Sequence, residues 1–323
     1  MASPGAEDTR GRSDPGEPSA GGGGPAGVLL AAAATVFFAS AAVLVRSAPG
    51  LPPAGLAAGR LLIGAVFVAL LGLLTRTPMA VRFRDLPALA GIAAVAALHF
   101  LFYILALERT SIAHTLVLVN LSPVFVAALS PWWLGERLRR GQSAGLALAV
   151  AGLAVMVGFE PRLTLASVAG DVLALGSGLM YAVYSLAGRS TRERHPLFRY
   201  TFWVYLLAAI LLWPFGRPAT TLAALRGSSL FVVLLLGLLP TGLGHTLYNA
   251  SLRRAPAAMV NLIATQEVTG GVLLGYIFFR EGLTGAAIGG ALALLGVALV
   301  TLFAETSMIR QPGGNPPGPS NTT

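Results

Sequence analysis

Apolar segments of roughly 20 residues alternate with short polar stretches along most of the chain. This length lets an α-helix cross the hydrocarbon core of a bilayer. Nearly all charged residues lie between these segments or near their ends, so the pattern predicts an all-α integral membrane protein embedded in a lipid bilayer. We predict ten transmembrane helices, over residues 26–45, 53–74, 86–107, 111–134, 142–157, 170–188, 197–215, 230–252, 256–279 and 284–303.

The second half of the chain repeats the first. Tyr103 corresponds to Tyr248 and Glu136 to Glu281 at one constant offset, and after a loop one residue shorter two glycines also correspond. Because five spans per copy is an odd number, the second copy must cross the membrane in the opposite direction. We therefore predict two inverted five-helix repeats, over residues 26–158 and 170–304. The corresponding glycines are Gly145 with Gly289 and Gly152 with Gly296.

Composition supports the membrane assignment and excludes several functions. Charged residues make up 11% of the chain and the mean hydropathy is +0.75, whereas about a quarter of the residues of a soluble domain are charged. The chain has no cysteine and no cluster with metal-ligand spacing, so we expect no metal and no cofactor. The net charge of +9 is spread over loops between spans, which argues against a nucleic-acid partner.

The loop arginines predict an orientation. Loops on one side carry 12 arginines and loops on the other side carry 6. The positive-inside rule places the first set, and with it both termini, in the cytoplasm. The terminal stretches 1–25 and 305–323 are rich in Pro and Gly and are predicted to be disordered cytoplasmic tails.

Short motifs add a resemblance to a known family. The first half contains a Thr-x-Ala-like turn over Thr110 to Ala113, LSPVF over Leu121–Phe125 and LGERL over Leu134–Leu138. With ten spans in two halves, these motifs resemble the EamA-type family of the drug/metabolite transporter superfamily. At Glu267 the family often has a Glu-Pro pair, but here Val268 follows, which puts a kink in doubt. The resemblance implies a small-metabolite transporter that works by alternating access, often as an exporter.

Glu267 is the main candidate site residue because it lies near the middle of the ninth predicted span. A carboxylate at that depth costs several kcal/mol unless it faces a cavity or a partner. Gly271 and Gly275 follow at helical spacing, so this face is expected to pack against another helix. We hypothesise that Glu267 binds a proton or the substrate. The alternative is a structural carboxyl that bonds to a carbonyl exposed by a kink.

Histidine and helix-breaking residues indicate an interior cavity. His99 and His245 fall in the equivalent third and eighth spans, and each could either titrate or donate to a carbonyl. Pro240 deprives the carbonyl of Leu236 of its helical partner, and Gly242 and Gly244 loosen the same turn. Since irregular backbone at membrane depth must line a cavity or be buried in protein, we predict an irregular segment there that faces the interior.

Further polar candidates lie in the fourth and ninth spans. Pro123 leaves a carbonyl beside Asn120 without its helical donor. Asn120 and this carbonyl could contact the substrate, or Pro123 could simply bend the helix. Asn261 and Gln266 extend the polar set, although Gln266 points about 100° away from the Glu267 face.

Three more residues could contribute to the path or stay at the membrane surface. Arg60 could face the substrate path, but we interpret it as snorkelling to the outer interface. Tyr103 and Tyr248 could place hydroxyls in the interior, but we favour interface anchoring.

Two motifs are assigned mainly structural roles. Glu136 and Glu281 are expected to cap the next helix or to pair with loop arginines. The GAAIG motif over residues 285–289 could hold the fold or a homodimer together.

Rival classes fit less well. An intramembrane protease would need paired mid-membrane Asp or a Ser–His pair in a catalytic pattern, and neither is found, so we do not expect an enzyme. We predict a secondary transporter of small metabolites or drugs and hypothesise that protons drive it. The alternatives are a facilitative channel or a receptor-like or structural membrane protein.

Overall fold

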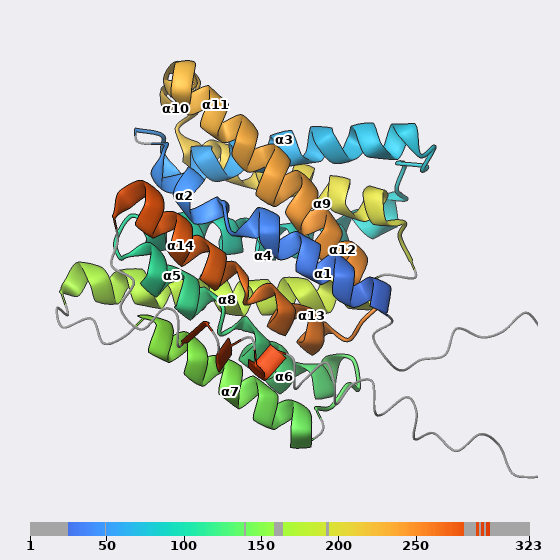
Figure 1. Cartoon of the computed structure of the whole chain (residues 1–323). Coiled ribbons are helices and arrows are strands. Elements are labelled where there is room, and N and C mark those ends of the chain that lie inside the picture. Colours follow the sequence, from blue (N-terminus) through green and yellow to red (C-terminus); the bar gives the residue numbers. More distant parts are fainter. Residues whose placement is uncertain are drawn as a thin grey trace, which may run out of the picture.

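A computed structural model of the chain shows an all-helical bundle whose long axes run side by side (Figure 1). It describes residues 25–48, 50–138, 140–157, 164–191 and 194–280, together with 289–290, 292–293 and 295–297. We call the end of the bundle where α1 begins the near end, and the end where α2 ends the far end.

The helices of the first repeat follow the predicted spans closely. They are α1 (Pro25–Phe38), α2 (Ala41–Arg46), α3 (Pro53–Leu74), η1 (Phe83–Asp85), α4 (Leu86–Leu107), α5 (Ile112–Val119), α6 (Ser122–Trp133) and α7 (Arg140–Val157). The first span is interrupted between α1 and α2, and the fourth between α5 and α6. Proline begins or nearly begins α3, α4 and α6, where its missing N–H is not needed.

The second repeat is described as far as its ninth span. Its helices are α8 (Leu165–Ser190), α9 (Leu197–Leu212), η2 (Trp213–Gly216), α10 (Pro218–Ala224), α11 (Gly227–Leu236), η3 (Gly237–Gly244), α12 (His245–Leu252), α13 (Ala257–Ala264) and α14 (Glu267–Phe279). Most of the predicted tenth span, both predicted tails and Glu281 lie outside the described residues.

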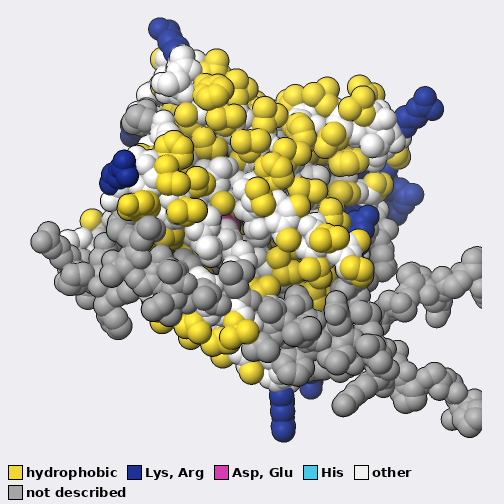
Figure 2. Space-filling model, in the orientation of Figure 1, with side chains coloured by type: hydrophobic (Ala, Val, Ile, Leu, Met, Phe, Trp, Pro, Cys, Tyr) yellow, Lys and Arg dark blue, Asp and Glu magenta, His cyan; other side chains and the backbone are white. Residues whose placement is uncertain are grey.

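The surface suits a bilayer. Within the described residues, eight helical stretches are long and apolar enough to cross a membrane, and α7 occupies the predicted fifth span. Hydrophobic side chains cover much of the described surface in Figure 2, while arginine side chains lie mostly at its edges. Large apolar side chains such as Leu73, 75% exposed, and Ile277, 51% exposed, face outward along the spans. The chain is a multi-pass membrane protein, as predicted.

The packing obeys the symmetry of an inverted repeat. The third span (α4) packs against the sixth (α8), and its counterpart, the eighth (η3 and α12), packs against the first (α1). Likewise α4 packs against α9, and η3 packs against α3. These contacts of one half therefore have partners in the other half.

Glycines bring the fifth and last spans together. A Cβ on Gly152 would lie 2.6 Å from the carbonyl oxygen of Gly289, and one on Gly296 would lie 2.5 Å from that of Gly145. The repeat partners thus contact each other crosswise. Gly289 is the only described residue of the GAAIG motif, and its contact with the same chain favours a role in the fold.

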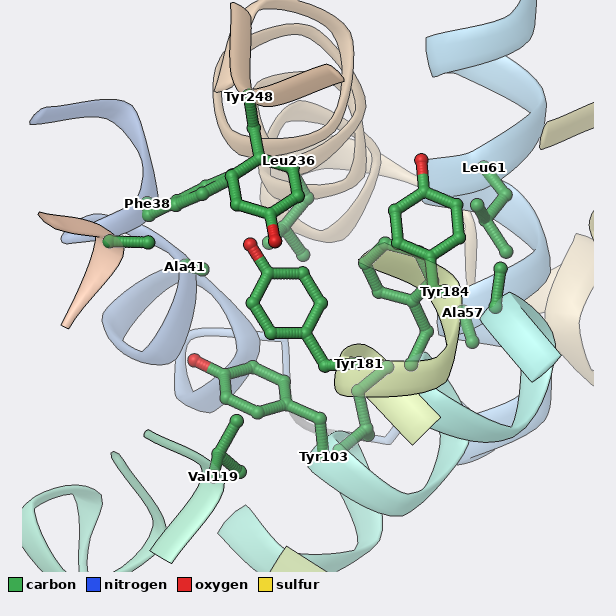
Figure 3. Close-up of a cluster of buried hydrophobic side chains, with 14 of the residues drawn as sticks. Phe38, Ala41, Ala57, Leu61, Tyr103, Val119, Tyr181, Tyr184, Leu236 and Tyr248 are labelled. Carbon is green, nitrogen blue, oxygen red and sulfur yellow. The ribbon is translucent and has the colours of Figure 1, made fainter. Parts of the chain in front are cut away.

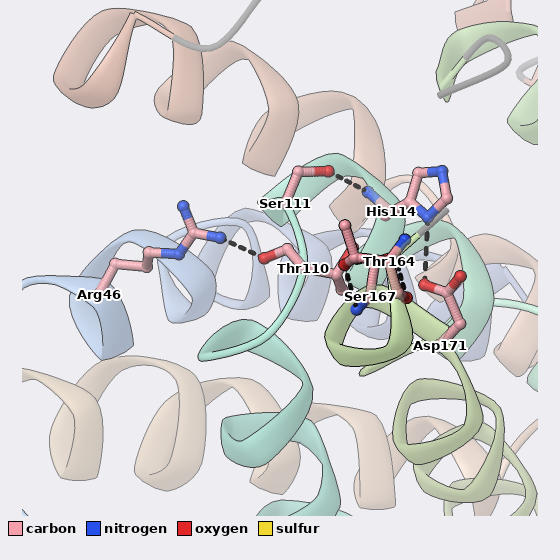
Figure 4. A network of polar contacts seen from close by, with 7 residues as sticks. All are labelled: Arg46, Thr110, Ser111, His114, Thr164, Ser167 and Asp171. Atoms are coloured by element: carbon pink, nitrogen blue, oxygen red, sulfur yellow. Dashed lines mark hydrogen bonds and ion pairs between the residues drawn. The ribbon is translucent and has the colours of Figure 1, made fainter. Parts of the chain in front are cut away.

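Ion pairs and caps tie the helices at both ends. At the near end, the Nε of Arg189 donates to Glu136, which also accepts the N–H of Ala257 at the start of α13 (3.4 Å). The predicted structural role of Glu136 is confirmed. At the far end, Ser111 caps α5, and His114 of α5 contacts Asp171 of α8 (3.1 Å; Figure 4).

Candidate functional site

A cavity lies at the centre of the bundle, between helices of both repeats. Its volume, measured as space for the centre of a water molecule, is about 30 Å³. On this measure one water needs roughly 10–15 Å³, so the cavity has room for about two. It is lined by Phe38, Ala41, Arg60, His99, Phe100, Tyr103, Val119, Asn120, Tyr181, Pro240, His245 and Glu267.

The irregular segment predicted from Pro240 is present. Residues 237–244 form a π-helix, η3, between α11 and α12. Pro240 has no N–H, so the Leu236 carbonyl lacks its α-helical donor. This carbonyl accepts a hydrogen bond from the hydroxyl of Thr241 (2.9 Å). The same hydroxyl accepts the Nε–H of Arg60 (2.9 Å). The break therefore builds a polar anchor for an arginine inside the bundle.

Two glycines of this segment allow aromatic rings to approach. A Cβ on Gly244 would lie 2.8 Å from the Phe38 ring, and one on Gly242 would lie 2.8 Å from the Phe67 ring. Any larger residue at either position would push its ring away. Gly242 and Gly244 thus shape the cavity wall without lining it.

Arg60 corrects one of our interpretations. It does not snorkel to the interface, since it is 1% exposed and lines the cavity. Its guanidinium carbon lies 4.6 Å above the centre of the Phe100 ring. Its Nη1 is buried and has no hydrogen-bond partner among the residues that the structure describes. The bond to Thr241 and the contact with Phe100 make this burial possible because they replace part of the lost hydration.

Glu267 lies at the start of a half-helix that faces the same cavity. The ninth span stops at Ala264 and resumes at Glu267 as α14, although Val268 stands where its repeat partner has Pro123. The carboxylate therefore lies at a helix N-terminus, where the helix dipole favours negative charge. No ion pair joins Glu267 to Arg60 within the described residues. On the expected packing face, Gly271 contacts Leu116 of α5.

The two histidines meet within the cavity. Their ring centres are 6.2 Å apart, and His245 is surrounded by Phe38 (4.6 Å) and Phe100 (5.0 Å). The Nδ1 of His99 lies 3.0 Å from the carbonyl oxygen of Ser177. The Ser177 hydroxyl lies 2.9 Å from the same nitrogen, so Nδ1 has both a carbonyl and a hydroxyl within hydrogen-bond distance.

The tyrosines correct a second interpretation. Tyr103 is 5% exposed and Tyr248 is fully buried, so neither anchors at the membrane surface. Tyr103 lines the cavity. The rings of Tyr181 and Tyr248 stack 5.1 Å apart, with hydroxyls pointing toward one another (Figure 3). Tyr248 also hydrogen-bonds to Ser185 of α8.

The remaining candidates divide between the cavity and its surroundings. Asn120 lines the cavity at the break between α5 and α6, and its amide donates to the carbonyl of Leu116 (2.9 Å). Pro123 is buried beside that break but does not line the cavity. Gln266 also lies outside the cavity, as its direction predicts.

Sequence reasoning missed the aromatic lining. Phe38, Phe100 and Tyr181 carry no signal in an apolar span, where most aromatic residues face lipid or core. Tyr181 stacks on His99 with ring centres 4.9 Å apart. Only its position on the same helix face as buried Ser177, four residues earlier, could have indicated it.

Comparisons with known proteins identify the family of the chain. The model of the EamA-like transporter family matches the chain twice, over residues 25–158 and 168–302. An uncharacterized transporter of Archaeoglobus fulgidus is 30% identical over 216 residues, 65% of this chain and 75% of the relative. The threonine/homoserine exporter RhtA of Salmonella typhimurium is 28% identical over 268 residues, 82% of this chain and 84% of that protein.

A solved crystal structure shares the fold. It superposes with a TM-score of 0.70 at 23% identity and covers 87% of this chain and 98% of its own. This likeness describes the architecture alone.

Proposed function

Because the chain belongs to the EamA-like transporter family, we propose that its central cavity binds a small zwitterionic amino acid and that the protein exports it from the cell. The chain is a membrane transporter. The substrate class, the direction of transport and the mechanism are our proposals.

We infer the substrate class from the two charged groups that line the cavity. The cavity holds one guanidinium, with a buried Nη1 that lacks a partner, and one carboxylate that is not paired with it. A charge buried without a partner is costly, so a ligand that satisfies both groups gains affinity. The carboxylate of an amino acid is suited to Arg60 and its ammonium group to Glu267. The relative named as a threonine/homoserine exporter supports this choice.

The cavity volume supports alternating access. Space for about two waters is too small for an amino acid, so the bundle must rearrange to admit one. Hinges are available where the first, fourth and ninth spans are interrupted beside the cavity. Inverted repeats give such a rearrangement two equivalent end states.

We propose that the near end is cytoplasmic, so that both termini face the cell interior. The predominance of arginine at that end supports this orientation. Single cysteines in this cysteine-free chain test it. Arg137→Cys at the near end should react with an impermeant reagent only from inside, and Arg226→Cys only from outside. The opposite pattern would overturn the orientation.

Transport in proteoliposomes tests the function. Threonine and homoserine should be taken up, while threonine amide and 3-hydroxybutanoate, each lacking one of the two charges, should compete poorly. Each compound should be measured with and without a proton gradient. Arg60→Gln and Glu267→Gln should abolish saturable uptake, whereas Arg226→Gln, an exposed arginine, should not. Equal competition by all four compounds would overturn the zwitterion site.

A further inference from the structure

A second pocket lies at the far end of the bundle, apart from the central cavity. It is formed by the end of α2, the loop into α3 and the end of α4, and its volume is about 290 Å³. It is therefore much larger than the central cavity on the same measure. Residues that line it include Val45, Arg46, Leu51, Leu56, Leu107 and Glu108.

The pocket is stacked on the central cavity. Three helices each supply one residue to the central cavity and one residue to the pocket. On each helix the pocket residue lies four positions closer to the far end than the cavity residue. Residues four apart lie on the same helix face, displaced by about 6 Å along the axis. The pocket therefore continues the cavity outward by about one helical turn. The pairs are Ala41 with Val45, Arg60 with Leu56, and Tyr103 with Leu107.

The equivalent place in the other repeat is tightly packed. Arg46 donates to the carbonyl of Leu107 and to that of Thr110 (Figure 4 shows the contact with Thr110), and Arg189 donates to those of Leu252 and Ala255. Leu107 corresponds to Leu252 and Thr110 to Ala255 in the repeat. The place beside Arg189 at the near end is therefore the counterpart of the far-end pocket.

There the helices are in close contact. A Cβ on Gly188, the counterpart of Val45, would lie 3.2 Å from Asn249 Oδ1 and 3.3 Å from the Tyr200 hydroxyl, so a side chain would fit only if these groups shifted. Of the two symmetric places, the far one holds a pocket and the near one holds a tight helix contact.

The charges at the pocket favour a cation. Glu108 follows the last residue of α4, where the helix dipole disfavours a carboxylate. Glu108 is exposed, and the partial burial of its carboxyl raises its pKa, while Arg109 opposes this shift. A bound ammonium group would relieve both costs. Arg46 is fixed by its bonds to α4 and forms a rigid wall of the same pocket.

We propose that the far-end pocket is a second binding site on the transport path, in which Glu108 receives the ammonium group of the amino acid as it passes between the central cavity and the outside. This inference rests on the proposed function for the identity of the ligand. The far-end pocket would be a second site, and transport through the central cavity does not by itself imply it.

Cysteine protection tests the pocket without transport. Leu51→Cys should react with an impermeant thiol reagent from the far side, since Leu51 lines the pocket. Threonine at about ten times its half-protecting concentration should slow this reaction about tenfold. Leu222→Cys lies on α10 and is 59% exposed, and its reaction should not respond to threonine.

Second substitutions separate this site from the central one. In the Leu51→Cys protein, Glu108→Gln should raise the half-protecting concentration at least tenfold, and Arg226→Gln, an exposed arginine outside the pocket lining, should leave it unchanged. Glu267→Gln should also leave it unchanged if threonine binds in the pocket itself. Loss of protection in Glu267→Gln would show a relayed conformational effect and overturn the proposal.

The two proposals fail in different ways. Protection without threonine transport would contradict the proposed function and keep the pocket. Transport of threonine with no protection, or with no reaction at Leu51→Cys, would contradict the pocket and keep the function. As a second measurement, Glu108→Gln should raise the half-saturating threonine concentration severalfold from the far side only, and an unchanged value would count against the site.

Discussion

Replacement of Arg60 by lysine tests the central site most directly. The guanidinium uses Nε on Thr241 (2.9 Å) and stacks over Phe100, which leaves Nη1 for the ligand. Lysine keeps the charge but has a single nitrogen, which cannot hold Thr241 and a carboxylate in the same planar geometry. One charge-assisted hydrogen bond contributes about 1.5–3 kcal/mol, so threonine should bind about 10- to 150-fold more weakly.

The comparison with threonine amide makes this prediction specific. The amide lacks the carboxylate, so Arg60→Lys should change its half-saturation little, and the ratio of the two values measures the interaction itself. Counterflow in proteoliposomes gives both numbers, with exposed Arg226→Lys as the control. Equal losses for both compounds would mean that Arg60 only supports the fold. Unchanged values for both would place the carboxylate elsewhere.

Four further substitutions examine coupling, packing and charge. Glu267→Gln should fold normally but lose threonine exchange as well as gradient-driven net transport, because the ammonium group of the substrate loses its partner, and unchanged rates over pH would show a structural carboxyl. Gly237→Ala should destabilise the protein in thermal unfolding by about 1–3 kcal/mol, because its Cβ would meet Ile63 and lie 3.1 Å from the Arg60 carbonyl oxygen. Gly91→Ala, with open space around it, should be neutral or stabilising by up to about 1 kcal/mol. Glu108→Gln should raise the Tm slightly at pH 7, where the charged form is disfavoured by the raised pKa, and this gain should vanish below pH 4.5, where the carboxyl is protonated in both states.

Patterns that depend on position along a span were predictable. Hydropathy set the limits of α3 and α4, and Pro240 marked the π-helical segment because a missing N–H has a local consequence. Local chemistry was insufficient in the ninth span. The ninth span is interrupted even though Val268 replaces the proline. The break is therefore set by the architecture that both repeats share and not by a proline at this position.

Patterns that depend on helix rotation were not predictable. The depth of Arg60 in its span fits both snorkelling and burial, and only packing against η3 turns it inward. Tyr103 and Tyr248 occupy places where tyrosine usually anchors at the interface, yet their rings complete an aromatic interior. Sequence gives the sign of a charge and its depth, but not the helix face that meets the partner.

The repeat also explains how a symmetric scaffold can hold an asymmetric ligand. At the constant offset, Tyr205 stands opposite Arg60 and Ser122 opposite Glu267, so each repeat contributes one charge that the other lacks. By contrast, the arginines that bind the ends of α4 and α12 are duplicated. The duplicated arginine contacts can hold either end of the bundle closed in the same way. Arg60 and Glu267 occur once each, so they fix one orientation of the substrate during the whole transport cycle. Exchange of the open and closed ends would therefore move the opening and leave the zwitterion bound to the same two side chains.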